Sequence, residues 1–592
     1  MKKILLPGIF FFVSIVVSTL IWEHINLSVN DIVKFIFFLS IPFLTLIFFY
    51  QSKEKKFFRN LKNVIFFDKN DNLSSEFKNI KILNFYTYFI LLFLLIEFFS
   101  VNFSNLNHNI DMFHEGMWLS ASQNLKTTGG YWSSSYVVRG FFGDFYPYFL
   151  WNFFGVESIG ITRFFYLVFI LFNKILLILI ARKLSLIVYL RNENYIYYFL
   201  FLSAVFLFFQ SYGNHLFILR SFLILLFALV LLNFLSNRKT NHIHCLIIGF
   251  FSSISFFWYI DIGIYINTLI FILVLFLIIR FEFKSLISLI LGTLTGWVIF
   301  YLSIPKLEFL EFIKNSFLII STLNDIHSIT FPTPFISMDA RSTKAMILFL
   351  ITGFLIIYAI NNLEEKNNKI YLTSIIFLFL ISCLYFSYGL SRSDSPHIRV
   401  ATGFIYIPFL SMIFYLILRK INFDAKKKFE VFKYSKKIIL SLIILSIFID
   451  KKYEDKKVIY IKDSFSEIQK LIKYDDNSFL RNDYKEFLDY YQDLSKNDDC
   501  ITIFTNEVAI YYFLKKPSCS KYYFMWTASP KEIQLQMIED IREKKPTYIL
   551  YKSDKDLFYD SDKSLLNINT FIKKSYIFYE KFKNWEIYKK KI

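Results

Sequence analysis

Apolar blocks long enough to cross a membrane recur along most of this chain. A helix needs about 20 apolar residues to span a hydrocarbon core roughly 30 Å thick. A soluble fold cannot hide such blocks in a chain of 592 residues that is 55% hydrophobic. The blocks therefore predict an all-α polytopic membrane domain of about 13 transmembrane helices. They include Ile4–Trp22, Leu83–Val101, Ile161–Ile180, Ile262–Ile279, Leu286–Ile304, Ala345–Ile360 and Phe404–Leu418.

The charge of the chain is strongly positive, with 66 Lys and Arg against 47 Asp and Glu and a net charge of +19. Such an excess can indicate nucleic-acid binding. Here the basic residues gather in short loops beside the apolar blocks, which is typical of membrane topology. The sequence contains neither a zinc-type cysteine cluster nor a nucleic-acid-binding signature. We therefore expect the bilayer, and no nucleic acid, as a partner.

The positions of the basic loops also predict the orientation. Lys2 and Lys3 precede the first apolar block, which lacks a small-residue cleavage site at its end. We interpret it as a retained anchor with a cytoplasmic N-terminus. Counting spans alternately from there places the basic loops inside and three segments outside. The outer segments are residues 102–160, 305–344 and 391–402.

Three regions follow from this map. Residues 1–82 form two transmembrane helices with a basic cytoplasmic loop, and residues 83–450 form the main transmembrane domain. In residues 451–592 the apolar runs Cys500–Thr505 and Thr547–Tyr551 alternate with a helical pattern over Pro530–Lys544. This alternation predicts an α/β domain outside the cytoplasm.

The four cysteines divide between these regions. Cys500 and Cys519 fall in the outer domain, where the compartment permits disulfides. Either a bond between them or two unpaired thiols is compatible with the sequence. Cys245 and Cys383 lie in spans, where we expect inert packing residues.

The first outer segment contains the densest group of reactive side chains. Asp111, His114 and Glu115 fall within one turn of each other if the segment is helical. Partial desolvation at a membrane surface is expected to raise the basicity of such carboxylates, which suits a general base. A chance cluster in a solvated loop is the alternative. Downstream, the aromatic run Phe141–Phe154, which includes Asp144, predicts a helix lying in the membrane interface.

The other outer segments carry positive charge. Lys344 lies in the second. The third contains Arg392, Asp394, His397 and Arg399, which can bind a phosphate group or can simply be solvated around the acid.

Two further ionisable residues, Arg220 and Asp261, lie near span ends. Ionisable groups at membrane depth are functional candidates by default, although snorkelling or a loop position also explains them.

Four motifs carry a family resemblance: IDMFHEG (Ile110–Gly116), GDFYP (Gly143–Pro147), WYIDIG (Trp258–Gly263) and SRSDSPHIR (Ser391–Arg399). With the order of spans, outer loops and C-terminal domain, the chain resembles the GT-C superfamily of membrane glycosyltransferases. It is similar in plan to bacterial relatives of protein mannosyltransferases and aminoarabinose transferases. The resemblance implies a multi-pass protein of the bacterial inner membrane, with its C-terminal domain periplasmic or extracellular.

The resemblance also implies an activity, the inverting transfer of a sugar from a polyprenyl-phosphate donor to a glycan, lipid or protein acceptor. Asp111 takes the role of the family's catalytic base, with Glu115 as the second choice. Many members have two adjacent acids there, so the separation of Asp111 from Glu115 is a departure. The two extra N-terminal spans are another. Some members use a divalent metal as cofactor, and the sequence offers no clear ligand set for one. The expected substrate-binding residues are His114, Asp144, Arg220, Asp261, Lys344, Arg392, Asp394, His397 and Arg399.

Two alternative functions remain open. A flippase or transporter for a lipid-linked glycan predicts paired charges deep inside spans and internal repeats, and neither is evident in the sequence. A polymerase or ligase of surface polysaccharides would use an outer loop with arginine and histidine, and would need no acidic loop.

Overall fold

The fold is dominated by long apolar helices. The computed structural model describes residues 2–24, 30–67, 80–100, 103–190, 194–212, 219–237, 241–327, 331–363, 368–391, 393–420, 431–448, 461–552 and 564–591. Within these residues, eleven helical segments are long and apolar enough to cross a membrane. A polytopic helical membrane domain is thus confirmed, whereas the total of about 13 spans stays a prediction.

The spanning segments have the following bounds: α1 (Lys2–His24), α2 (Asp31–Glu54), α4 (Ile80–Phe99), α7 (Ile159–Ile187), α9 (Leu219–Ser236), α10 (Asn241–Trp258), α11 (Ile260–Ile279), α12 (Phe283–Leu302), α14 (Ala340–Asn361), α15 (Lys369–Ser391), and the continuous run of α16 (Ser395–Ala401), η4 (Thr402–Ile405) and α17 (Tyr406–Lys420). Helices α8 (Asn194–Tyr212) and α18 (Val431–Phe448) pack against each other beside them.

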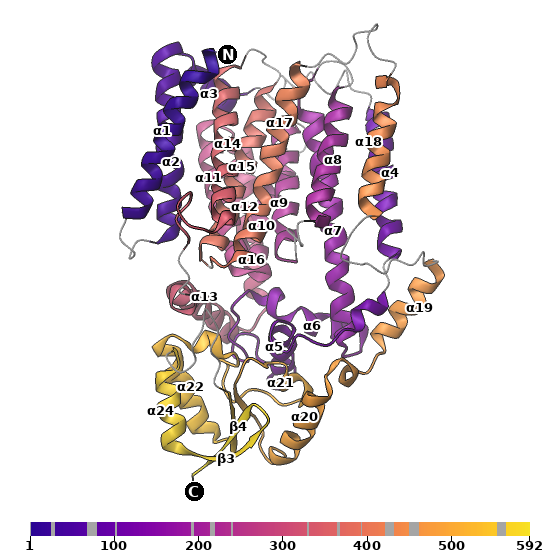
Figure 1. Cartoon of the computed structure of the whole chain (residues 1–592), viewed down its shortest axis with the longest axis vertical. Helices are drawn as coiled ribbons and strands as arrows, with labels where there is room; N and C mark the ends of the chain where they lie inside the picture. Colours follow the sequence, from indigo (N-terminus) through magenta and orange to yellow (C-terminus); the bar gives the residue numbers. More distant parts are fainter. Residues whose placement is uncertain are drawn as a thin grey trace.

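The spans stand upright, and the two ends of the bundle differ (Figure 1). The N-terminus and the short helix α3 (Phe57–Ile65) lie at one end. At the other end α6 (Phe141–Phe154) and α13 (Lys306–His327) lie across the bundle, and the C-terminal region lies beyond them. The segments predicted as outer loops and the C-terminal region therefore share one end of the bundle, opposite the N-terminus.

Small residues allow the closest packing between spans. A Cβ atom added to Gly292 of α12 would lie 2.1 Å from the carbonyl oxygen of Leu246 in α10. One added to Gly249 of α10 would lie 2.2 Å from the carbonyl oxygen of Leu289. Gly292 and Gly296 form a G-x-x-x-G pattern, which lets helix backbones approach in a membrane. The glycines therefore determine how closely α10 and α12 pack.

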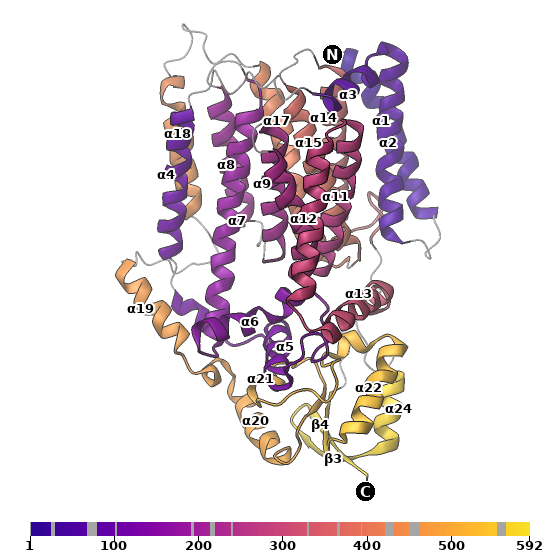
Figure 2. The same ribbon diagram turned by 180° about the vertical axis from the view of Figure 1, so that it is seen from behind.

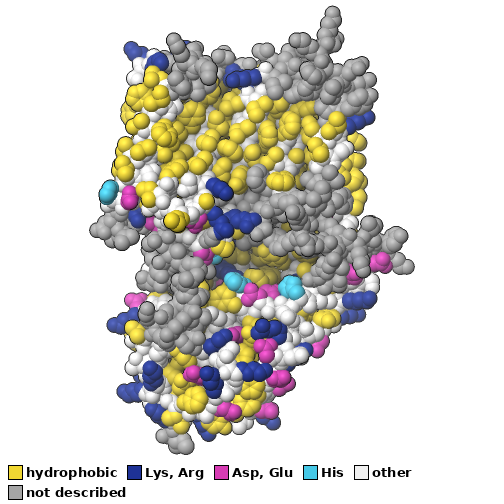
Figure 3. Space-filling model, viewed as in Figure 1, with side chains coloured by type: hydrophobic (Ala, Val, Ile, Leu, Met, Phe, Trp, Pro, Cys, Tyr) yellow, Lys and Arg dark blue, Asp and Glu magenta, His cyan; other side chains and the backbone are white. Residues whose placement is uncertain are grey.

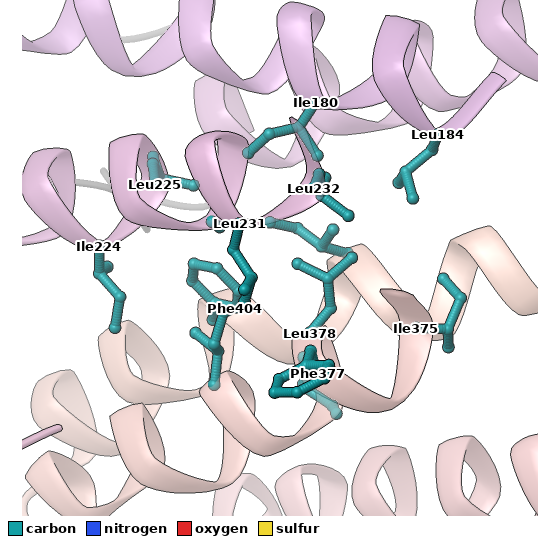
Figure 4. Packing of buried hydrophobic residues seen from close by; sticks show 14 of the residues in the cluster. Ile180, Leu184, Ile224, Leu225, Leu231, Leu232, Ile375, Phe377, Leu378 and Phe404 are labelled. Carbon is teal, nitrogen blue, oxygen red and sulfur yellow. The ribbon is translucent and has the colours of Figure 1, made fainter. Parts of the chain in front are cut away.

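Aliphatic and aromatic side chains fill the centre of the bundle. Ile180 of α7, Leu231 of α9 and Leu378 of α15 meet there, close to Phe404 (Figure 4). On the outside, hydrophobic side chains cover the flank of the bundle, whereas charged side chains spread over the C-terminal region (Figure 3). This distribution suits a bundle whose flank faces lipid.

The C-terminal region contains a four-stranded sheet in the order β1-β2-β4-β3. Strand β1 (Thr502–Phe504) pairs in parallel with β2 (Tyr548–Tyr551), and α22 (Lys531–Lys544) lies between them in the chain. These are the strands and the helix that the apolar pattern predicts. The antiparallel hairpin of β3 (Tyr576–Phe582) and β4 (Trp585–Lys590) was not predicted, because β3 is largely exposed and lacks a continuous apolar run.

Short helices complete this end of the molecule: η2 (Phe103–Asn107), α5 (His114–Thr128), α19 (Ile461–Ile472), η5 (Asp476–Phe479), α20 (Asn482–Leu494), α21 (Ile510–Phe513), η6 (Met525–Ala528) and α24 (Leu566–Ser575). Cys500 and Cys519 form a disulfide, one of the two states that the sequence left open.

Helix α5 joins the bundle to the C-terminal region. The backbone N–H of Ala509 donates to the carbonyl of Met112 at 3.0 Å. The Tyr523 hydroxyl donates to the carbonyl of Met117 at 2.9 Å. A Cβ atom on Gly116 would lie 2.5 Å from the Ala509 nitrogen. The beginning of α5, with the acidic motif, is thus held by direct backbone contact.

One prediction about the outer segments needs correction. Residues 305–344, expected to be a loop, contain the 22-residue helix α13. Helix α6 has the predicted bounds, and its position in the membrane interface stays a prediction; much of its aromatic surface packs on protein. Its Phe142 ring stacks on Trp258 with centroids 4.3 Å apart, and its exposed rings are at the C-terminal end.

Candidate active site

Asp111 and His114 form a pair at the beginning of α5. One carboxylate oxygen of Asp111 accepts the backbone N–H groups of Phe113 at 3.0 Å and His114 at 2.9 Å. Its other oxygen lies 2.8 Å from Nδ1 of His114. An acidic side chain is favourable here because the first N–H groups of a helix point at it. The side chains are 49% and 61% exposed, so the pair faces outward.

The electrostatics of Asp111 differ from the sequence-based prediction. Partial burial raises the pKa of Asp111, but several interactions outweigh it and lower the pKa to about 2. These are the hydrogen bonds from the side chain and backbone of His114, the charge of the imidazole and the hydrogen bond from the backbone N–H of Phe113. The expectation of raised basicity is therefore wrong for this residue. Its carboxylate remains ionised under all ordinary conditions and binds protons weakly.

Glu115 is occupied by an ion pair. Arg163, near the beginning of α7, donates from Nε and Nη2 to the two carboxylate oxygens of Glu115, each at 2.7 Å. The Arg163 and Glu115 side chains are 5% and 15% exposed. Such a bidentate pair fixes the positions of both side chains and occupies both carboxylate oxygens of Glu115.

Sequence reasoning missed Arg163, although one signal was present. An arginine just inside the outer end of a span, close to an unpaired acidic motif, is a candidate partner. The arginine also donates to backbone carbonyls of Leu106 and His108. Arg163 therefore holds the segment that leads into α5 in place.

Asp144 is buried in the first turn of α6. Its carboxylate accepts the backbone N–H of Arg139 at 3.0 Å. Burial raises the pKa of Asp144, while the charges of Arg139 and, more weakly, Arg220 lower it. The Arg139 guanidinium lies 5.4 Å from the ring of Trp118. Asp144 thus belongs to a buried charged group between α5, α6 and the end of the bundle.

Arg220 and Asp261 are the spanning-helix members of this group. Nη2 of Arg220 lies 3.3 Å from Oδ1 of Asp261. The guanidinium is also held between two aromatic rings, 4.0 Å from the centroid of Tyr388 and 5.0 Å from that of Tyr259. Both residues are in the first turn of their helices, α9 and α11, at the end of the bundle below which α5 and α6 lie.

The third outer segment meets this group through an aromatic contact. The Asp394 carboxylate accepts the backbone N–H of His397 at 3.0 Å and also contacts its Nδ1. The imidazole lies 5.2 Å from the ring of Tyr388, which covers Arg220. Asp394 and His397 thus repeat the D-x-x-H cap of Asp111 and His114, in a mostly buried setting.

The remaining predicted phosphate-binding residues are less well connected. Lys344 is exposed in the second turn of α14. Arg399 is partly buried on α16, where its charge acts on Tyr406. Arg392 lies outside the described residues. The structure therefore brings together Arg220, Asp261, Asp394 and His397.

A recess separates the bundle from the C-terminal region. Figure 3 shows histidine and acidic side chains along its edge.

A pocket of 380 Å³ lies at the same end of the bundle, between α6, η5 and α21, and none of the predicted site residues lines it. Its lining residues are Val156, Glu157, Ile472, Lys473, Tyr474, Asp475, Asp476, Asn477, Tyr512, Phe513 and Lys515.

One buried ion pair joins two spans. Lys174 lies near the middle of α7, and its Nζ is 3.2 Å from both carboxylate oxygens of Glu97, which is in the last turn of α4. The side chains are 7% and 6% exposed. The spans therefore do contain a buried ion pair, which the count of charges along the sequence overlooked.

The described residues contain no group of three or more His, Cys, Asp or Glu side chains placed to hold a metal ion. No family model matches the sequence, and no curated protein is similar enough to it to carry an assignment. The function must therefore be argued from the site itself.

Proposed function

We propose that this chain is a membrane glycosyltransferase that moves a sugar from a polyprenyl-phosphate carrier to an acceptor hydroxyl. The observation that carries the proposal is the ionised Asp111–His114 pair, exposed at the same end of the bundle as the buried Arg220 group. A lipid-linked donor places its sugar phosphate at the membrane surface, where these two groups lie. The family resemblance of the motifs supports the same reaction.

The reaction is a single displacement at the anomeric carbon. The acceptor oxygen forms a bond to that carbon while the bond to the phosphate oxygen breaks, and its electron pair leaves with the lipid phosphate. The hydroxyl proton goes to the Asp111–His114 pair. Such a displacement inverts the anomeric configuration.

The two members of the pair have different tasks in this scheme. With its pKa near 2, Asp111 is a weak base, but it is always charged and orients the imidazole and the acceptor hydroxyl. An imidazole held by a carboxylate through Nδ1 can accept a proton at Nε2. In this scheme Asp111 is therefore the orienting carboxylate, and Nε2 of His114 accepts the proton.

Positive charge is needed where the phosphate leaves. Arg220 carries a delocalised charge between two tyrosine rings, and His397 is adjacent through Tyr388. A guanidinium in a poorly solvated site stabilises developing phosphate charge strongly. We assign Arg220 and His397 to the leaving phosphate, with Arg399 and Lys344 as further contributors from the same end of the bundle, and we keep Arg392 as a candidate on the sequence alone.

The C-terminal region provides a place for the acceptor. The 380 Å³ pocket combines the aromatic ring of Tyr474 with the polar groups of Asp475, Asn477 and Lys515. Aromatic faces with adjacent amide and carboxylate groups suit a polyhydroxylated ligand. We assign this pocket to the acceptor glycan or glycolipid.

The test uses full-length protein in lipid nanodiscs, supplied with a radiolabelled polyprenyl-phosphate sugar. Asp111→Asn should reduce transfer by about 10²-fold or more, because it removes the charge that orients the reaction. Donor binding, measured separately, should be retained. Asp483→Asn is the matched control, since Asp483 is an exposed acid in the C-terminal region. Unchanged transfer by Asp111→Asn removes the proposed role of the pair.

The buried ion pair favours a second candidate, a flippase for a lipid-linked glycan. Transporters use paired charges within spans, and Lys174 of α7 forms a buried pair with Glu97 in the last turn of α4. In proteoliposomes, a flippase would move a fluorescent lipid-linked sugar across the bilayer, and Lys174→Met would stop that movement. A transferase gives sugar transfer without movement.

The orientation belongs to the same proposal. We place the α5 end and the C-terminal region outside the cytoplasm of a bacterial inner membrane. A cysteine introduced at Tyr579, which is exposed on β3, should react with an impermeant thiol reagent in intact cells. Reaction only after lysis would reverse the orientation and exclude an outer active site.

A further inference from the structure

Helix α13 has apolar residues on both sides: Phe312 and Ile319 are buried against the protein, and several others are exposed. Its exposed face carries Leu307, Leu310, Phe317 and Ile320, of which Leu307 and Phe317 are 76% and 70% exposed. These residues are spaced by three or seven along the helix and share one face. In water, a surface helix turns its polar face outward. The exposed face of α13 therefore indicates a different environment.

The inward side of α13 also carries polar residues, which bond to neighbouring parts of the chain. Glu308 accepts the backbone N–H of Trp132 at 2.6 Å and contacts the backbone and hydroxyl of Ser133. Asn315 donates to the carbonyl of Val137 at 2.8 Å and accepts its N–H at 3.1 Å. These bonds attach the segment between α5 and α6 to α13.

The same face also reaches the C-terminal region. Glu311 forms an ion pair with Lys521 at 3.1 Å. This side of α13 therefore packs against protein. It contacts both the first outer segment and the C-terminal region. The exposed apolar side is left to the surroundings of the molecule.

The apolar face of α13 continues the lipid-facing surface of the bundle. Leu302, the last residue of α12, is 74% exposed, and α13 begins four residues later. Figure 2 shows α12 running down to α13. After α13, Phe335, Ile336 and Met338 are also exposed, just before α14 begins. Exposed apolar groups thus extend from one span through α13 to the next.

Two lysines lie on the exposed side of α13. Lys306 is exposed at its start, and Lys314 is exposed among the apolar residues, where its Nζ pairs with Glu311 at 2.9 Å. Lysines reach from an apolar face to the headgroup region and interact with phosphate there. An amphipathic helix with these features lies in the plane of the membrane interface.

We propose that α13 is an interfacial helix whose apolar face is embedded among the lipids of the leaflet next to the C-terminal region. Its inner face fixes residues 132–137 and the C-terminal region at a defined depth relative to that leaflet. The partner is the phospholipid bilayer itself. This inference does not depend on the reaction proposed above.

Spin labels at single cysteines in full-length protein test the position of α13. Phe317→Cys is made in a background with Cys245→Ser and Cys383→Ser, and the labelled protein is placed in nanodiscs of phosphatidylcholine and phosphatidylglycerol. Phe271→Cys on α11 is the control for lipid, and Phe578→Cys on β3 is the control for water, since both rings are similarly exposed.

The measured quantity is the ratio of the label's collision rate with oxygen to its collision rate with a water-soluble nickel chelate. We expect this ratio to be several-fold higher at position 317 than at position 578. A ratio equal to that at position 578 would place α13 in water and overturn the proposal. An immobile label shielded from both reagents would place a second copy of the protein on this face, and would also overturn it. Leu307→Cys gives an independent reading if Phe317→Cys fails to fold.

Discussion

Breaking the Arg163–Glu115 pair should loosen the segment that leads into α5. The carboxylate and guanidinium are nearly buried and form two hydrogen bonds of 2.7 Å. Removing one partner of such a pair leaves a buried charge uncompensated, at about 3–5 kcal/mol. Arg163→Met should therefore favour local opening of residues 106–116 by roughly 10²- to 10⁴-fold.

Hydrogen exchange with mass spectrometry in nanodiscs measures this opening directly. Amides in residues 106–116 should lose protection in Arg163→Met. The control is Arg182→Met on the same helix, because Arg182 pairs with the neutral side chain of Asn84 at 2.7 Å and lies far from this segment along α7. That control should leave residues 106–116 unchanged.

A double-mutant cycle measures the coupling energy between Glu115 and Arg163. Glu115→Gln alone leaves Arg163 without its charged partner, and the double variant Glu115→Gln/Arg163→Met removes both charges. The double variant should cost about 2–3 kcal/mol less than the sum of the single changes. Wild-type protection in Arg163→Met would refute the structural role of the pair. Loss of transfer in Glu115→Gln with full protection would instead make Glu115 a member of the chemistry.

Three other changes have defined outcomes. Because the pKa of Asp111 is lowered from 3.8 to about 2, the contribution of its charge is fully present above its ordinary pKa and is lost only as the pH falls to about 2. The ratio of transfer rates between wild type and Asp111→Asn should therefore stay constant as the pH falls from about 8 to about 5, and a ratio that shrinks over this range would contradict the lowered pKa. Gly292→Ile should lower thermal stability in detergent by about 1–3 kcal/mol, since a Cβ atom there meets a carbonyl oxygen at 2.1 Å; unchanged stability would contradict the close packing of α10 and α12. Replacing Cys500 and Cys519 by serine should destabilise the C-terminal region by about 2–4 kcal/mol in chemical unfolding, because the bond closes a loop with a sequence separation of 19. If the wild type and the double-serine variant unfold at the same denaturant concentration, the bond does not contribute to stability.

The sequence predicted the membrane class because length and hydrophobicity are local quantities. Every span can be recognised from its own residues, and so can the strand Thr502–Phe504 and the helix Lys531–Lys544. The hairpin β3–β4 and the helix α13 were missed because their apolar residues do not mark one buried face. Strand β3 is largely exposed, and α13 has apolar residues on both its buried and its exposed sides.

The candidate site was predicted in part. The motif around Asp111 forms the start of a helix, and Arg220 and Asp261 meet as ionisable groups at span ends. The partners of these residues were not predictable, because they come from distant parts of the chain. Arg163 reaches Glu115 across 48 positions, and this long-range contact decides which acid remains exposed.

The sequence by itself determined that this is a helical membrane protein with an acidic motif and a C-terminal α/β region. Hydrophobic length and charge distribution fix these properties without reference to any partner residue. Only the tertiary structure decided the electrostatic state of each acid. A carboxylate's pKa and availability depend on the groups folded around it, so Asp111 is ionised beside His114 whereas Glu115 is occupied by Arg163.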